Sequence, residues 1–135
     1  MYSNNLMTIL TFETKLYILL HENGNKRIET TFVDGLEHGM HQEWYDDGVE
    51  FLIVTYVRGI KHGLFQRWYK NGITKLKTNY NYEKLHSTYK EYYENGTLSL
   101  QTIYTNNQQN GLHQEWYSTQ ILSGRLYTRL LYSDY

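Results

Sequence analysis

A period of 24 residues constrains this chain more than any other feature. Glycines recur at that interval, each preceded by Asn or Asp, at Gly24, Gly48, Gly72 and Gly96. An aromatic pair keeps the same interval, and its second member is invariant: Tyr45, Tyr69, Tyr93 and Tyr117. A repeat of this length is one small structural unit that buries a face only by stacking on its neighbours. The sequence therefore predicts an array of stacked repeats.

Each repeat contains two runs that are typical of β-strands. In residues 50–56 and 64–69 of the second complete repeat, β-branched and aromatic residues dominate. Glycines between the runs suit a turn with positive φ, and the Asn-Gly pair that follows is a strong hairpin signal. We therefore predict an all-β fold, an elongated single-layer antiparallel meander of about five 24-residue β-hairpins. Each repeat would advance the rod by roughly 10 Å, since neighbouring strands lie about 4.8 Å apart.

The chain 1–135 is expected to be one repeat domain with irregular ends. The regular repeats are 25–48, 49–72, 73–96 and 97–120; a degenerate cap hairpin (1–24) precedes them and a cap strand (121–135) follows. In the first cap, residues 6–12 are expected to pair with the strand that begins near Lys15. In the last cap, one strand is expected from Gly124 to Tyr132.

Alternation along the strands predicts two different faces. In the first strand of each repeat, the columns of residues 28, 30 and 32 are expected to face a core, and the intervening columns mostly water. In the second strand, Met40, Gln42 and Trp44 share one face, and His41, Glu43 and Tyr45 share the other. We interpret the tryptophan column as core, since aromatics bury the most area per residue. The tyrosine column fits either core or an exposed stacking surface.

The repeat resembles the MORN repeat, and more closely the variant in which an aromatic pair precedes Asn-Gly. The residues that carry the resemblance are Trp44-Tyr-Asp-Asp-Gly48, Trp68-Tyr-Lys-Asn-Gly72, Tyr92-Tyr-Glu-Asn-Gly96, Gly35-Leu-Glu-His-Gly39 and Gly59-Ile-Lys-His-Gly63. It covers roughly residues 16–120 and implies an elongated single sheet of hairpins. It also implies non-catalytic roles: protein interaction, scaffolding or contact with membrane phospholipid. Four loop positions depart from the pattern and put the loop geometry there in doubt: Glu83, Ser87, Asn107 and Asn110.

Composition removes several classes of protein. The chain has no Cys, which excludes disulfides, zinc–thiolate sites and iron–sulfur clusters. Its net charge of −1 excludes a globally basic nucleic-acid binder, so no nucleic acid is expected as a partner. No apolar run reaches the length of a transmembrane helix, and the first ten residues lack a basic segment typical of a secretory signal. We expect a protein that is not secreted, located in the cytoplasm or within a particle. Abundant Asn, Lys, Tyr and Ile hint at an AT-rich genome, such as that of a large DNA virus or some bacteria.

No group of residues indicates an enzyme or a metal centre. His38 and His41 are three residues apart, but the other repeats do not reproduce the pair. His38 and His62 are therefore expected to be loop residues that hydrogen-bond a neighbouring hairpin. Glu43, Arg67, Glu91 and Glu115 share one column, and we interpret them as a solvated row, because adjacent members would lie about 10 Å apart. We predict no catalytic residues, no bound metal and no cofactor.

The expected function is a non-catalytic protein–protein interaction or assembly scaffold. Its candidate contact surface comprises Tyr45, Tyr69, Tyr93, Tyr117, Glu43 and Arg67. One alternative is a peripheral membrane adaptor that binds acidic phospholipid through Arg58, Lys61, Lys70, Lys75 and Lys77. A second alternative is an antitoxin-like binder that masks a toxic partner. Apolar ends predict self-association or docking onto an assembly through Leu6, Ile9, Leu130, Leu131 and Tyr132.

Overall fold

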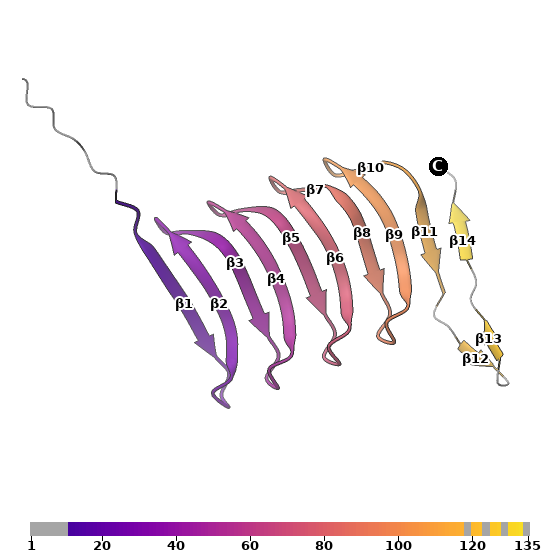
Figure 1. Cartoon of the computed structure of the whole chain (residues 1–135), viewed down its shortest axis with the longest axis horizontal. Coiled ribbons are helices and arrows are strands. Elements are labelled where there is room, and N and C mark those ends of the chain that lie inside the picture. Colours follow the sequence, from indigo (N-terminus) through magenta and orange to yellow (C-terminus); the bar gives the residue numbers. More distant parts are fainter. Residues whose placement is uncertain (1–10, 118–119, 123–124, 128–129, 134–135) are drawn as a thin grey trace, which may run out of the picture.

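The computed structural model describes residues 11–117, 120–122, 125–127 and 130–133, and every regular element within them is a β-strand (Figure 1). Twelve strands form one antiparallel sheet, whose neighbours follow chain order almost throughout. In Figure 1 the strands lie side by side as an open, single-layer rod. The predicted fold class, an antiparallel meander of hairpin repeats, is confirmed.

Each regular repeat supplies a first strand and a second strand to the sheet. The first strands are β2 (Lys26–Val33), β4 (Glu50–Val57), β6 (Thr74–Asn81) and β9 (Leu98–Thr105). The second strands are β3 (Leu36–Trp44), β5 (Ile60–Trp68), β8 (Ser87–Tyr92) and β11 (His113–Trp116). Two short strands, β7 (Lys84–Leu85) and β10 (Gln108–Gln109), pair with β6 and β9 respectively.

Two kinds of turn fold the chain back and forth. Within a repeat, two consecutive residues have positive φ, as at Asp34 (51°) and Gly35 (78°), which is the signature of a type I′ hairpin turn. Between repeats, the glycine of the Asn-Gly or Asp-Gly pair ends a tighter loop. There the Gly48 N–H donates to the Tyr45 carbonyl at 3.0 Å, and the Asp47 carboxylate accepts from the Val49 N–H at 3.1 Å. The 24-residue interval between these glycines is therefore the interval between successive inter-repeat turns.

The departures from the loop pattern change the strands more than the turns. Positive φ persists without glycine at Glu83 (63°), Ser87 (95°) and Asn107 (68°), so the hairpins keep their shape. The second strands of the third and fourth repeats are nevertheless split, into β7 and β8 and into β10 and β11, whereas β3 and β5 are continuous. The departures in these loops therefore interrupt the second strands but leave the fold unchanged.

The sheet has two different faces, as alternation predicted. We call the face that carries columns 28, 30 and 32 the tyrosine face, because Tyr45 and its equivalents lie on it. Cross-strand pairs such as Ile28 with Glu43 and Thr30 with His41 place columns 41 and 43 there too. The opposite face, which carries Gln42 and Gln66, is the glutamine face. The most buried column lies on the tyrosine face, with exposed fractions of 3% or less, at Thr30, Val54, Thr78 and Thr102.

The tryptophan column is half-buried, so its interpretation as core is wrong in degree. Trp44, Trp68 and Trp116 all retain partial exposure. Val54 is the one fully buried apolar residue among those that the structure describes. The physical reason is that the described part of the chain supplies no second layer to cover the sheet. The Lys26 ammonium lies 4.9 Å from the Trp44 ring centroid and covers part of that ring.

The structure tests the predicted cap at the C-terminal end of the sheet only. Residues 1–10, with Leu6 and Ile9 and most of the proposed partner of β1 (Thr14–Leu20), lie outside the described residues. The single C-terminal strand expected from Gly124 to Tyr132 is wrong. β13 (Arg125–Tyr127) pairs instead with β12 (Gln120–Leu122) in a separate two-stranded sheet. Only β14 (Leu130–Ser133) joins the main sheet, where Trp116 pairs with Leu130 and Glu115 with Leu131.

The part of the chain that the structure describes contains no helix that could cross a membrane.

Candidate interaction surfaces

The regular 24-residue spacing of the tyrosines reflects a ladder of hydrogen bonds between repeats. Each tyrosine hydroxyl donates to a backbone carbonyl 23 residues further on, in the next repeat. The bonds are Tyr45 to Trp68 (3.0 Å), Tyr69 to Tyr92 (2.8 Å) and Tyr93 to Trp116 (2.6 Å). His21 occupies the same column and places its Nε2 2.9 Å from the Trp44 carbonyl. Three of the four tyrosines predicted to form a contact surface therefore hold the rod together, while Tyr117 at its end is half exposed.

Side chains in the turns between repeats make a second set of links. The Asn23 side-chain amide donates to the Asp46 carbonyl at 2.7 Å, and that of Asn71 donates to the Glu94 carbonyl at 2.8 Å. Asp47 has no amide donor, and at this position an ion pair between Lys70 and Asp46 (3.0 Å) joins the turns instead. This pairing lowers the pKa of Asp46 and raises that of Lys70.

The charged column lies on the tyrosine face and alternates with leucines. By register the row runs through Glu43, Leu52, Arg67, Leu76, Glu91, Leu100 and Glu115. Glu43, Arg67 and Glu91 are half-buried, so the solvated row expected from the sequence is partly covered. The Arg67 guanidinium is 5.1 Å from the Phe51 ring centroid.

Each glutamate of this row is held by the residue two positions earlier on its own strand. The Glu43 Oε1 lies 3.1 Å from Nε2 of His41, and the Glu115 Oε1 lies 2.8 Å from Nε2 of His113. The Glu91 Oε1 accepts a 2.5 Å hydrogen bond from the Tyr89 hydroxyl. Burial and the bond to Glu91 raise the pKa of Tyr89, which keeps this hydroxyl a donor. The glutamates are thus oriented by the sheet.

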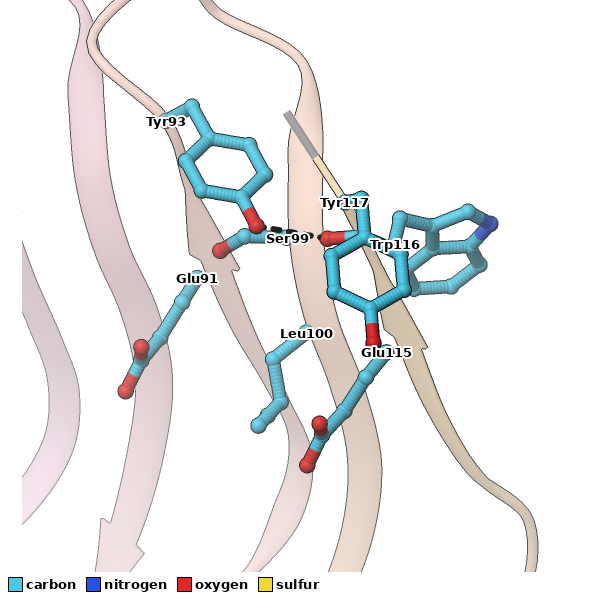
Figure 2. A pocket seen from close by; sticks show the side chains of 7 residues that line it. All are labelled: Glu91, Tyr93, Ser99, Leu100, Glu115, Trp116 and Tyr117. Atoms are coloured by element: carbon cyan, nitrogen blue, oxygen red, sulfur yellow. Dashed lines mark hydrogen bonds between the residues drawn. The ribbon is translucent and has the colours of Figure 1, made fainter. Parts of the chain in front are cut away.

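A cavity of about 340 Å³ opens on the tyrosine face near the end of the regular repeats (Figure 2). Its lining combines carboxylates, aromatic rings and a small residue: Glu91, Tyr93, Ser99, Leu100, Glu115, Trp116 and Tyr117. Figure 2 shows the carboxylates of Glu91 and Glu115 on either side of Leu100, below the rings of Tyr93 and Tyr117. Sequence analysis singled out both tyrosines and both glutamates but missed the cavity, whose only signal was a serine at position 99.

The histidine side chains contact neighbouring residues of the sheet and its turns. The Arg58 N–H of the next hairpin donates to Nδ1 of His38 at 3.4 Å, as expected, but His38 lies in strand β3 and not in a loop. His62 instead packs against the Tyr82 ring at 4.6 Å, and its Nδ1 has no partner among the described residues, so the expectation for His62 is wrong. The His41 Nδ1 lies 2.9 Å from the Glu37 Oε1. No cluster of three metal-ligating side chains occurs in the described residues.

The basic residues proposed to bind lipid are not brought together. Arg58 lies in the turn between β4 and β5, whereas Lys70 lies in the turn at the opposite end of β5. The Lys61 and Lys75 ammonium groups lie over aromatic rings, 5.5 Å from the centroid of Tyr80 and 5.2 Å from that of Tyr69. Lys77 pairs with Gln66 and so lies on the glutamine face.

Apolar side chains form a row across the glutamine face. Met40 pairs with Thr55, Leu64 with Asn79, and Thr88 with Ile103, so apolar side chains alternate with polar ones from strand to strand along this row. We define the apolar row by its most exposed members, whose exposed fractions lie between 42% and 62%: Leu16, Met40, Ile103 and Leu112. The sequence directed the column of Ile103 towards water and placed Met40 on the face of the tryptophan column, which was interpreted as core. The signal that could have revealed the row is the aliphatic column Met40, Leu64 and Leu112.

These observations define a class of protein, a rod of stacked β-hairpin repeats joined by side-chain bonds from each repeat to the next. Residues 61–82 and 85–106 match the family model of the MORN repeat variant. These two segments are therefore MORN repeats of the variant type. Each matched segment runs from the second strand of one repeat through the inter-repeat turn to the first strand of the next. MORN repeats generally bind proteins or membrane lipids, and the family is generally non-catalytic. A search of the curated proteins found no match.

Proposed function

We propose that this chain is a non-catalytic protein-binding module and that its contact surface is the apolar row of the glutamine face. The observation that carries the proposal is the exposure of four large apolar side chains along one side of a single-layer sheet. Single apolar residues are normal on protein surfaces, whereas several large ones gathered on one face are typical of interaction sites. The row follows the long axis of the rod, so a partner could contact several repeats at once.

The charge distribution supports a protein partner over a membrane. Anionic lipid attracts basic side chains that face one plane, since the attraction fades within about a Debye length of the surface. Here Arg58 and Lys70 lie at opposite ends of β5, and Lys70 is already paired with Asp46. The apolar row needs no such charge, and its flanking glutamines can supply polar contacts at the rim of an interface.

A paired substitution tests this function. Met40→Asp with Leu112→Asp places two charges in the apolar row. The matched control, Gln42→Asp with Gln114→Asp, places them on the same face two residues further along the chain, in β3 and in β11, which Leu112 immediately precedes. The parent chain is used to capture proteins from its native source, and captured proteins are identified by mass. We expect the row variant to lose at least ninety per cent of the captured partner and the control to retain it.

Thermal melting must first show that both variants fold, because Met40 and Leu112 are exposed whereas Gln42 and Gln114 are half-buried. A parent chain that captures no protein would overturn the proposal, as would folded variants that both retain or both lose the same partner.

A further inference from the structure

The cavity on the tyrosine face exists because the fourth repeat lacks a side chain that its predecessors supply. The relevant column is Arg27, Phe51, Lys75 and Ser99, one residue per repeat at an interval of 24. In the second repeat, Phe51 packs edge-on against Tyr45 at 5.1 Å, with the Arg67 guanidinium 5.1 Å from its ring. In the third repeat, the Lys75 ammonium lies 5.2 Å from the Tyr69 ring. In both, a cation lies against an aromatic ring.

The fourth repeat has the aromatic rings of this arrangement but, in the described part of the chain, no long side chain packed against them. Tyr93 and Tyr117 supply the rings, and Ser99 is too short to lie over either of them. The resulting cavity of about 340 Å³ is large enough for a long side chain. Figure 2 shows the space between the two rings and the two carboxylates.

The charge of the cavity is also unbalanced. Between Glu43 and Glu91 the row contains Arg67, but Glu91 and Glu115 flank Leu100 alone. Among the residues that the structure describes, no Lys or Arg lines the cavity, so its two carboxylates have no cationic partner within the described walls. Each carboxylate bonds Tyr89 or His113 through Oε1, which leaves the Oε2 atoms to meet a ligand.

We propose that this cavity binds an arginine side chain of a partner protein. A planar guanidinium presents N–H donors on two edges and can be engaged from both sides, whereas an ammonium is a point charge. Glu91 and Glu115 lie on strands two spacings apart, roughly 10 Å, and therefore approach from opposite sides. Guanidinium groups also stack on aromatic rings, as Arg67 does on Phe51. This site lies on the face opposite the apolar row and does not depend on it.

The test uses N-acetyl-arginine amide as the probe and its neutral counterpart, N-acetyl-citrulline amide, as the matched ligand. Backbone amide resonances of the full chain are followed by NMR during titration. We expect shifts confined to β8, β9 and β11 and a Kd on the order of millimolar, as befits so small a ligand. The citrulline compound should cause no saturable shift.

Three variants locate the site. Glu91→Gln with Glu115→Gln should weaken binding by about a hundredfold, since each charge-assisted contact contributes about tenfold. Glu43→Gln, the same change in the same column where Phe51 fills the space, should have no effect. Ser99→Lys should abolish binding, because it recreates the arrangement of Lys75 over Tyr69 inside the cavity.

Any of three results would overturn the proposal: no saturable shift with the arginine compound, equal binding of the citrulline compound, or unchanged binding by a folded Ser99→Lys variant. None of these measurements involves the apolar row, so loss of the proposed protein-binding function and loss of the arginine site are distinguishable.

Discussion

The first two regular repeats and the last two build the same hairpin by different means. In repeats 25–48 and 49–72, glycine supplies positive φ and the second strands, β3 and β5, run without a break. In repeats 73–96 and 97–120, Glu83, Ser87 and Asn107 adopt the same dihedral region and the second strands are split. The fold therefore requires the backbone geometry of these turns more strictly than it requires glycine, and the continuity of the strand is what varies.

The core column differs between the halves as well. In the N-terminal half it contains Thr30, whose hydroxyl donates to Glu37, and Val54. In the C-terminal half it contains Thr78 and Thr102, whose hydroxyls have no partner among the described residues. Val54→Ala should lower the free energy of unfolding by about 2 kcal/mol, because it removes two buried methyl groups. Thr102→Ala removes only one, and its hydroxyl has no partner among the described residues, so the loss should be about 1 kcal/mol or less. Urea unfolding of both variants measures the two losses of unfolding free energy. Equal losses would contradict the expected difference between valine and threonine in this column.

Exchanging the loop residues tests whether glycine matters to the split. Gly63 has a φ of 101°, and an added Cβ would lie 3.4 Å from the Cβ of Thr55, so Gly63→Ser should cost about 1–2 kcal/mol. Ser87 has a φ of 95°, and Ser87→Gly should gain about 1 kcal/mol by removing that strain. Hydrogen exchange of the β8 amides should slow in the second variant. An unchanged melting temperature for both would show that φ imposes no strain at this column.

Replacing threonine with valine in the core column should make the third repeat resemble the second, which has Val54 at that position. Thr78→Val removes a buried hydroxyl without a partner and should raise the free energy of unfolding by about 1 kcal/mol. Thr30→Val is the control, because the Thr30 hydroxyl donates to Glu37 at 3.3 Å and its loss offsets the gain. Thermal melts of the two variants decide the matter. Destabilisation by Thr78→Val would indicate that its hydroxyl is hydrogen-bonded.

The smallest expected effect compares the middle of the tyrosine ladder with its end. Tyr69→Phe removes the 2.8 Å bond to the Tyr92 carbonyl and should cost about 1 kcal/mol. Burial raises the pKa of Tyr69, so this hydroxyl stays protonated at neutral pH and the comparison does not depend on buffer. Tyr117→Phe, at a half-exposed position, should change the unfolding free energy by no more than about 0.5 kcal/mol. Equal effects in urea titrations would contradict a ladder that ends at Tyr93.

The fold was predictable because its signals are local and repeated. Gly48 and its equivalents mark turns that any single repeat would need, and alternation around Thr30 assigns the buried face. The use of the tyrosines was not predictable, since a hydrogen bond to a backbone carbonyl has no partner visible in the sequence. The cavity at Ser99 follows from a missing side chain, which only the equivalent positions of Phe51 and Lys75 make evident. The tryptophans were placed too deep because the sequence does not show whether a second layer covers the sheet.

The tyrosine ladder gives the rod a polarity with evolutionary consequences. Every hydroxyl points toward the following repeat, so each repeat carries a donor for its successor and a carbonyl acceptor for its predecessor. A duplication of 24 residues in register would add both the tyrosine donor and the carbonyl acceptor of a new bond between repeats. A deletion of 24 residues would remove both. Genes encoding such a rod can therefore lengthen or shorten their product by whole repeats without inventing a new interface, and reach becomes a property that selection can tune in steps of roughly 10 Å.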